Sequence, residues 1–333
     1  MKPRLLLAAT AAGALALTGC SDSASGGGGG DGEAFVPESV DLVVHTGPGG
    51  GSDVFARGVE QLLTESGLSE GSWTVRNESG GSGASAMAFM RGLGGESETI
   101  AFTTPTWLTT PLTNAEAEVT MADMTPIAQL VGEPMVMAVA DDSPHQSLQD
   151  FVDAAEAEPG GLVQTGGSST SVDAVAGAVI QEATGTDWEY LSFEGGGERI
   201  AAVLSGDADM MFGAPSDFSE QVRAGEMRVI ATIGPEPTDL FPDAEALPDA
   251  GFDVEVPSQL RGVVGPPDMP QEAVDYYAGL FEELSQTPEW EAYVEENGLT
   301  SEYAGPDEWQ AAISEQEELL RTTLDRLGLL AAR

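Results

Sequence analysis

The segment from Asp41 to Leu63 constrains the fold of this 333-residue chain more than any other. Residues Asp41 to Thr46 form an alternating, mostly apolar run that predicts a short buried strand. The glycines and proline of residues 47–51 cannot continue that strand. Apolar residues then recur at helical spacing from Phe55 to Leu63, so the segment predicts a strand, a glycine loop and a helix.

A loop of this kind aims the unpaired N–H groups of a helix's first turn at one point. Those groups carry a partial positive charge, and glycines let a ligand approach the backbone, so an anion is the expected ligand. The loop lacks the Gly-Lys-Ser/Thr of a P-loop, and it has Ser52 where a dinucleotide fingerprint needs glycine. A tight turn that only joins strand to helix is the alternative.

A second unit of the same design follows later in the chain. Residues Leu162 to Thr165 predict a strand, residues 166–171 a polar loop, and Val172 to Ile180 a helix. Two such loops facing each other across a cleft would hold a carboxylate between two helix N-termini. Asp53 and Asp173 would repel an anion if they pointed at it, so we expect each to cap its own helix.

The same reasoning predicts an i, i+4 ion pair between Asp53 and Arg57.

The rest of the chain alternates strands and helices, which indicates open, largely parallel sheets with the binding site in the loops at the strand ends. Residues 104–112 form one such loop, whose hydroxyl groups and indole suit a ligand rim; a hydroxyl-rich surface loop is the alternative. Pro215 and Ser216 belong to another loop of this kind.

The N-terminus has the features of a secretion signal. Lys2 and Arg4 precede an apolar run that ends at Leu17-Thr18-Gly19-Cys20. This ending resembles a bacterial lipobox, in which Cys20 is lipidated; an ordinary signal peptide with a chance cysteine is the alternative. Residues 20–34 are rich in glycine and serine and predict a flexible linker. We therefore expect a folded body anchored by lipid outside the cytoplasm.

The charge of the chain excludes several classes of partner. Twelve Lys and Arg residues stand against 56 Asp and Glu, which gives a net charge of -44. Nucleic-acid binding needs clustered cations and is not expected. The hydrophobic content of 41% supports a real core. Adaptation to salt and adaptation to an extracellular habitat both remain open as reasons for the acidity.

The residues give little support to an enzyme. Only His45 and His145 could act as imidazole bases, and no serine stands in a Gly-x-Ser-x-Gly motif. Two distant histidines and one cysteine provide no metal-ligand cluster. We predict no catalytic residue, cofactor or metal. His45 ends the first strand beside the glycine loop and either touches the ligand or is structural.

Several motifs in order along the chain resemble one family. They are PGGGSDVFAR at 48–57, MTPIAQL at 124–130, the Gly-Gly-Ser loop at 166–168, FEGGGERIAAVLSGDADMMFG at 193–213, AGEMRVIAT at 224–232 and FPDAEALPDAGFDVEV at 241–256. Together they are similar to the substrate-binding proteins of tripartite tricarboxylate transporters, the Bug receptor family. Many relatives carry a histidine at the start of the second helix, where this chain has Ala174.

The resemblance implies an α/β, two-lobed fold of the type II periplasmic-binding-protein kind, with a ligand cleft between the lobes. In that family the two loops hold a ligand carboxylate, and the protein presents it to a membrane permease. We expect a signal peptide at 1–19, a lipid-anchored linker at 20–34, lobe 1 at 35–132 and 257–333, and lobe 2 at 133–256. Hinges are expected near 132–134 and 256–258.

The predicted function is that of an extracytoplasmic solute-binding lipoprotein, a monomer that delivers a tricarboxylate, dicarboxylate or related organic acid to its permease. A lipoprotein that senses a ligand for a membrane kinase, and a secreted hydrolase, are the alternatives. Neighbouring permease genes would support transport, and an adjacent kinase gene would support sensing. The predicted ligand-binding residues are Thr46, Gly47, Gly49, Gly50, Gly51, Ser52, Asp53, Thr104, Thr106, Trp107, Gly167, Ser168, Ser169, Thr170, Ser171, Asp173, Pro215 and Ser216.

Overall fold

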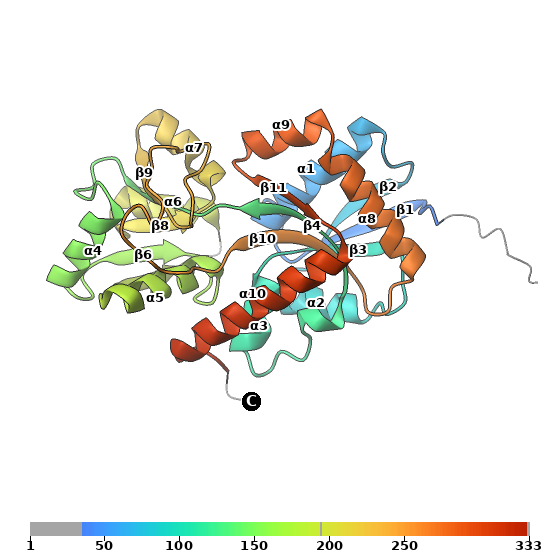
Figure 1. Cartoon of the computed structure of the whole chain (residues 1–333), viewed down its shortest axis with the longest axis horizontal. Coiled ribbons are helices and arrows are strands. Elements are labelled where there is room, and N and C mark those ends of the chain that lie inside the picture. Colours follow the sequence, from blue (N-terminus) through green and yellow to red (C-terminus); the bar gives the residue numbers. More distant parts are fainter. Residues whose placement is uncertain (1–34, 194, 332–333) are drawn as a thin grey trace, which may run out of the picture. The chain divides into compact units, whose positions relative to one another are not determined.

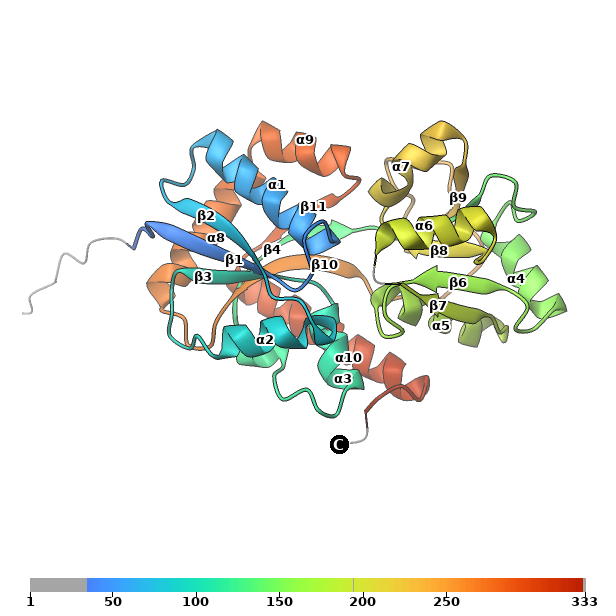
Figure 2. The ribbon, with the colours of Figure 1, turned by 180° about the vertical axis from the view of Figure 1, so that it is seen from behind.

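The computed structural model describes residues 35–193 and 195–331, and these form an α/β body with two sheets (Figures 1 and 2). The predicted signal peptide, linker and lipidation site at Cys20 lie outside the described residues. None of the helices in the described ranges is both long and apolar enough to cross a membrane.

The first sheet has six strands in the order β11-β4-β10-β3-β1-β2. Strand β1 pairs in parallel with β2 and β3, whereas β10 is antiparallel to both β3 and β4. The strands are β1 (Ser39–Val44), β2 (Ser72–Asn77), β3 (Thr99–Thr103), β4 (Thr125–Glu133), β10 (Gln259–Gly265) and β11 (Thr300–Ala304).

Helices cover both faces of this sheet. One face packs against α1 (Gly51–Ser66), α8 (Gln271–Ser285) and α9 (Pro288–Glu296), and the other against α2 (Ala84–Arg91), α3 (Thr106–Thr113) and α10 (Pro306–Arg326). Short 3₁₀ turns, η1 (Gly81–Gly83) and η2 (Met121–Asp123), lie between them. Since successive strand side chains alternate, Leu42 and Val44 of β1 enter one core and Val43 enters the other.

The second sheet has five strands in the order β7-β6-β8-β5-β9. They are β5 (Val136–Ala140), β6 (Val163–Gly166), β7 (Glu189–Ser192), β8 (Met210–Gly213) and β9 (Met227–Thr232). Helices α4 (Leu148–Ala157) and α5 (Val172–Thr184) cover one face, and α6 (Gly196–Ser205) and α7 (Pro215–Ala224) cover the other. The strand, loop and helix units predicted at the two glycine loops are therefore β1 to α1 and β6 to α5.

The prediction of largely parallel sheets is confirmed for the direction of β1 to β4 and of β6 to β9, but both sheets also contain antiparallel strands. In the first sheet β10 pairs antiparallel with β3 and β4, and β11 pairs antiparallel with β4. In the second sheet β5 pairs antiparallel with both β8 and β9. The reason is the path of the chain. It leaves the first sheet after Glu133, enters the second at Val136, and returns between Thr232 and Gln259, so a connecting strand in each sheet runs against its neighbours. Figure 1 shows β4 and β10 side by side at this crossing.

A second connection between the lobes is apolar. Val175 and Val179 of α5 belong to the same buried cluster as Leu320 and Leu324 of α10. Arg326 also pairs with Glu182 across these two helices at 2.6 Å. Helix α10 therefore joins the lobes in addition to the crossing strands.

The predicted rim loop at residues 104–112 is wrong, since most of this segment is helix α3 and is buried. Two hydroxyl groups of the segment donate to nearby carbonyl oxygens: Thr109 to Thr106 O at 3.4 Å, and Thr110 to Ser82 O at 2.6 Å. Trp107 is fully buried in the apolar cluster of α2, α3 and α10. Trp107 is therefore not a rim residue.

Candidate functional site

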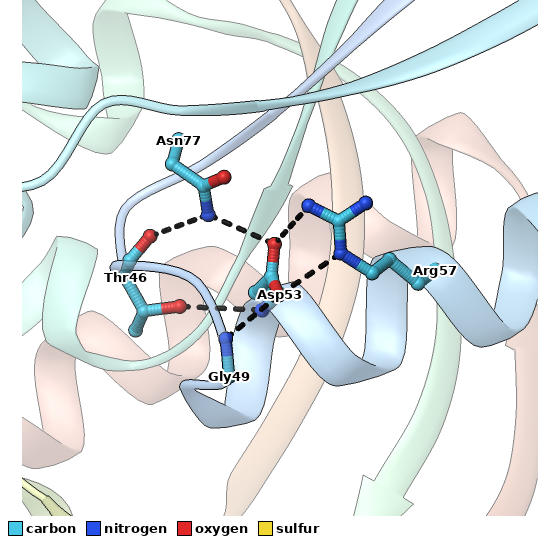
Figure 3. A network of polar contacts seen from close by, with 5 residues as sticks. All are labelled: Thr46, Gly49, Asp53, Arg57 and Asn77. Carbon is cyan, nitrogen blue, oxygen red and sulfur yellow. Dashed lines mark hydrogen bonds and ion pairs between the residues drawn. The ribbon is translucent and has the colours of Figure 1, made fainter.

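The first glycine loop is held in shape by the carboxylate of Asp53, which lies in the first turn of α1 (Figure 3). The Gly49 N–H donates to Asp53 Oδ2 at 2.8 Å, and Asn77 Nδ2 donates to Oδ1 at 2.9 Å. Arg57 adds two hydrogen bonds, at 3.0 and 2.9 Å. Asn77 also donates to Thr46 O at 2.8 Å, which ties the end of β2 to the loop. The predicted pairing of Asp53 with Arg57 is confirmed.

These contacts fix the charge of Asp53. The hydrogen bond from Arg57 is the largest cause that lowers the pKa of Asp53, to about 2; burial opposes it, and the bonds from Gly49 and Asn77 add to it. Asp53 is 3% exposed, so its charge faces its own loop and not a ligand. Its side chain acts by ordering the loop.

The backbone of this loop has little freedom to accept other residues. Gly49 has a φ of 80°, a left-handed conformation that favours glycine. A Cβ atom on Gly50 would lie 2.7 Å from Cβ of Thr46. The Thr46 hydroxyl in turn accepts the N–H of Asp53 at 3.2 Å. Thr46, Gly49 and Gly50 are therefore needed for the shape of the loop itself.

The first turn of α1 keeps two donors free. Among the described residues, the N–H groups of Gly51 and Ser52 have no hydrogen-bond partner. Both lie at the positive end of the helix. They are the donors that the sequence analysis expected to meet an anion.

The second loop repeats the design. Asp173, in the first turn of α5, accepts the N–H of Gly167 at 2.9 Å and the hydroxyl of Tyr190 at 2.9 Å, and it also contacts Ser171 Oγ. A side chain on Gly166 would overlap both Asp173 and Tyr190. Burial, followed by the charge of Asp173, raises the pKa of Tyr190, which keeps its hydroxyl a donor.

The first turn of α5 also keeps free donors. Within residues 35–193 and 195–331, the N–H groups of Val172 and Asp173 have no partner. The side chains of Ser168 and Thr170 bond only to each other, at 3.3 Å. Each lobe therefore presents a helix N-terminus whose acidic residue is turned back into its own loop.

Two arginines that the sequence analysis did not select lie beside these loops. Nη2 of Arg261 lies 3.5 Å from the position of a Cβ on Gly51, and Nη2 of Arg199 lies 3.5 Å from the same position on Gly167. Arg261 is buried and pairs with Glu133 at 2.7 Å. Arg199 is half-buried and forms no ion pair with any described carboxylate. Arg199 is part of the GGGER motif, but its position beside Gly167 depends on the fold.

Pro215 and Ser216 lie in the first turn of α7, next to Asp217. Asp217 as a whole is exposed, and its carboxylate accepts the N–H of Ala214 at 3.3 Å. Desolvation, followed by the charge of Glu133, raises the pKa of Asp217 to about 6; Arg261 and Arg199 act in the opposite direction.

His45 and Trp107 carry polar atoms without partners. Nδ1 of His45 and Nε1 of Trp107 are buried and have no hydrogen-bond partner among the described residues, and the two ring centroids lie 6.3 Å apart. Burial, and secondarily the charge of Arg261, lower the pKa of His45 to about 4, so its imidazole is neutral at neutral pH.

The role of Asp53 gives a stability prediction. We expect Asp53→Asn to lower the free energy of unfolding at pH 7 by about 2 kcal/mol, because the amide replaces a charged acceptor. The pKa of Asp53 is depressed from 3.8 to about 2, so its contribution is present above pH 3.8 and is lost as the pH falls toward 2. Urea unfolding should show a smaller difference between variant and wild type at pH 3 than at pH 7.

The exposed Asp249 provides a control, since Asp249→Asn removes the same charge at the surface. Its effect should stay within about 0.5 kcal/mol. An equal loss for Asp53→Asn at both pH values would contradict the proposed ordering role of its charge.

The chain is similar to known proteins in sequence and fold. The model of the tripartite tricarboxylate transporter family receptor matches residues 67–329. A Cupriavidus necator protein described as "UPF0065 protein in gbd 5'region" is 21% identical over 327 residues, which covers 97% of each chain.

Solved structures show the same fold at low identity. The structure of an R. palustris protein with adipate covers 88% of this chain and 98% of its own, with a TM-score of 0.81 and 20% identity. MatC from Rhodopseudomonas palustris with bound malate covers 87% and 97%, with a TM-score of 0.70 and 18% identity.

These findings confirm the predicted two-lobed periplasmic-binding-protein fold. The family is described as one of receptors, which confirms the prediction of a binding protein instead of an enzyme. Because the family model spans most of the sequence, the chain belongs to the tripartite tricarboxylate transporter receptor family.

Proposed function

We propose that this protein is an extracytoplasmic solute-binding lipoprotein that captures a small carboxylate and delivers it to a tripartite tricarboxylate transporter permease. The observation that carries the proposal is the pair of helix N-termini, each with free N–H groups and an aspartate turned back into its loop. A carboxylate satisfies such donors directly. The adipate and malate of the two structural neighbours support this class of ligand.

The lobes take different parts in this proposal. Lobe 1, residues 35–132 and 257–333, offers the N–H groups of Gly51 and Ser52. Lobe 2, residues 133–256, offers those of Val172 and Asp173 and the hydroxyls of its loop, Ser168 to Thr170. Gly47 belongs to the loop of lobe 1, and Gly167 and Ser171 belong to the loop of lobe 2. Pro215 and Ser216, at the start of α7, stay predicted ligand contacts of lobe 2.

Anchoring and delivery rest on the sequence. The lipobox-like ending at Cys20 would attach the mature protein to the membrane surface by lipid, with residues 20–34 as a linker. We propose that the protein acts as a monomer. Loss of membrane association in a Cys20→Ala variant would be the expected result, and unchanged association would argue against lipidation.

The ligand class can be tested by a thermal-shift screen of mono-, di- and tricarboxylates, amino acids and sugars. A ligand that binds only the folded state raises the melting temperature, by mass action. We expect a shift with one class of carboxylate and none with its uncharged amide. Absence of a shift with every carboxylate, also after unfolding and refolding to remove a copurified ligand, would count against the proposal.

We expect the two lobes to close on the ligand by a hinge motion at residues 132–134 and 256–258. Small-angle X-ray scattering with and without a ligand from the screen should show a smaller radius of gyration in the complex. Superimposable profiles at saturating ligand would rule out closure.

The raised pKa of Asp217 predicts that the affinity for a carboxylate ligand depends on pH. The pKa of this carboxyl group is raised to about 6, so between pH 7.5 and pH 5.5 the group gains a proton and loses a negative charge near Arg261. We expect carboxylate affinity to rise roughly threefold over this range, for a ligand whose own groups titrate below it. Calorimetry on Asp217→Asn should show a flat profile, and a profile as steep as that of wild type would show that another group is responsible.

A further inference from the structure

Arg261 lies where the lobes are joined. It belongs to β10, the strand by which the chain returns to the first sheet, and its partner Glu133 is the last residue of β4, from which the chain leaves that sheet. Both side chains are 10% exposed. The ion pair is therefore buried beside the connection between the lobes.

The contacts with Glu133 occupy one side of the guanidinium group. Nε donates to Glu133 Oε2 at 3.1 Å, and Nη2 contacts both carboxylate oxygens at 2.8 and 2.7 Å. A guanidinium has five N–H donors in a fixed plane. Nη1 has no hydrogen-bond partner among the described residues, so this end of the guanidinium group is left for another acceptor.

Helix α1 lies next to the guanidinium. Nη2 lies 3.5 Å from the Cβ position of Gly51, and Cζ lies 5.4 Å from the ring centroid of Phe55, one helical turn later. These contacts bring the cation to the helix end where the N–H groups of Gly51 and Ser52 have no partner. Nδ1 of His45, a buried atom beside the same loop, also has no hydrogen-bond partner among the described residues.

We propose that Arg261 supplies the buried positive charge of the carboxylate site, and that Glu133 is a positioning residue that limits how strongly this charge attracts the ligand. The inference rests on the proposed function, of which it names one specificity-determining residue. A ligand carboxylate accepts from Gly51 and Ser52 and from the free end of the guanidinium. Glu133 orients that end while its own charge repels the ligand.

This arrangement predicts affinity changes of opposite sign for the two members of one ion pair. Arg261→Gln should weaken binding of the carboxylate at least tenfold, which corresponds to the loss of one charge-assisted hydrogen bond. Glu133→Gln should strengthen binding roughly threefold, because the Coulomb repulsion is removed while an oxygen acceptor for Arg261 remains. The same Glu133→Gln variant should lower the melting temperature, since a buried ion pair is broken.

The experiment is isothermal titration calorimetry with adipate, malate, succinate and citrate as probes. It compares wild type, both single variants and the double variant Arg261→Gln/Glu133→Gln, whose net charge equals that of wild type. Glu317→Gln is the matched control, because Glu317 pairs with Arg321 on the exposed face of α10 at 2.6 Å. It changes the net charge of the protein by the same amount as Glu133→Gln and should leave the affinity unchanged.

The double variant remains informative if Arg261→Gln does not fold, because it leaves no buried unpaired charge. We expect it to bind at least tenfold more weakly than wild type. Two outcomes would overturn the proposed role of Arg261 and leave the carboxylate proposal intact. One is a double variant with wild-type affinity, and the other is a Glu133→Gln variant that has both a lower melting temperature and a weaker affinity. Wild-type protein that binds none of the four probes would overturn the carboxylate proposal, and this inference with it.

Discussion

The donors at the start of α1 and α5 have to stay free for a ligand while the loops in front of them stay ordered. Asp53 and Asp173 meet both conditions, because each accepts a loop N–H, from Gly49 and Gly167 respectively. A carboxylate in the first turn of a helix is itself stabilised by the helix dipole. Its charge is then used to order the loop, and the positive end of each helix remains available to an anion.

An anion site in a chain with a net charge of -44 requires local forces to exceed long-range repulsion. Exposed charges are screened beyond roughly 8 to 10 Å, whereas hydrogen bonds and buried charges act at contact distance. Two of the described arginines, Arg199 and Arg261, lie at the two loops. We therefore expect the surface acidity to have little influence on a carboxylate at the proposed site.

The elements that the sequence predicts well are those defined by local physics. Apolar periodicity and the positions of glycine predict the bounds of α1 and α5 to within a few residues. The i, i+4 spacing predicts the ion pair between Asp53 and Arg57. Helix α3 was missed because a threonine hydroxyl suits a binding loop and a helix that bonds its own carbonyls equally well. The pairing of Arg261 with Glu133 joins residues 128 positions apart, which no local pattern encodes.

The contacts between the lobes also bear on how they could close. Separating α5 from α10 would expose Leu320 and Leu324, and each buried leucine is worth about 2 kcal/mol. Gly298 also lies beside the second lobe, next to Leu240 and Pro215, but as a glycine it adds no side chain to that contact. A closing motion therefore costs least if it preserves the contact between α5 and α10 and changes the one at Gly298. In the proposed hinge motion the pivot lies beside the crossing strands, where Arg261 and Glu133 are paired. A carboxylate at the proposed site, the start of α1, would then act on the connection between the lobes.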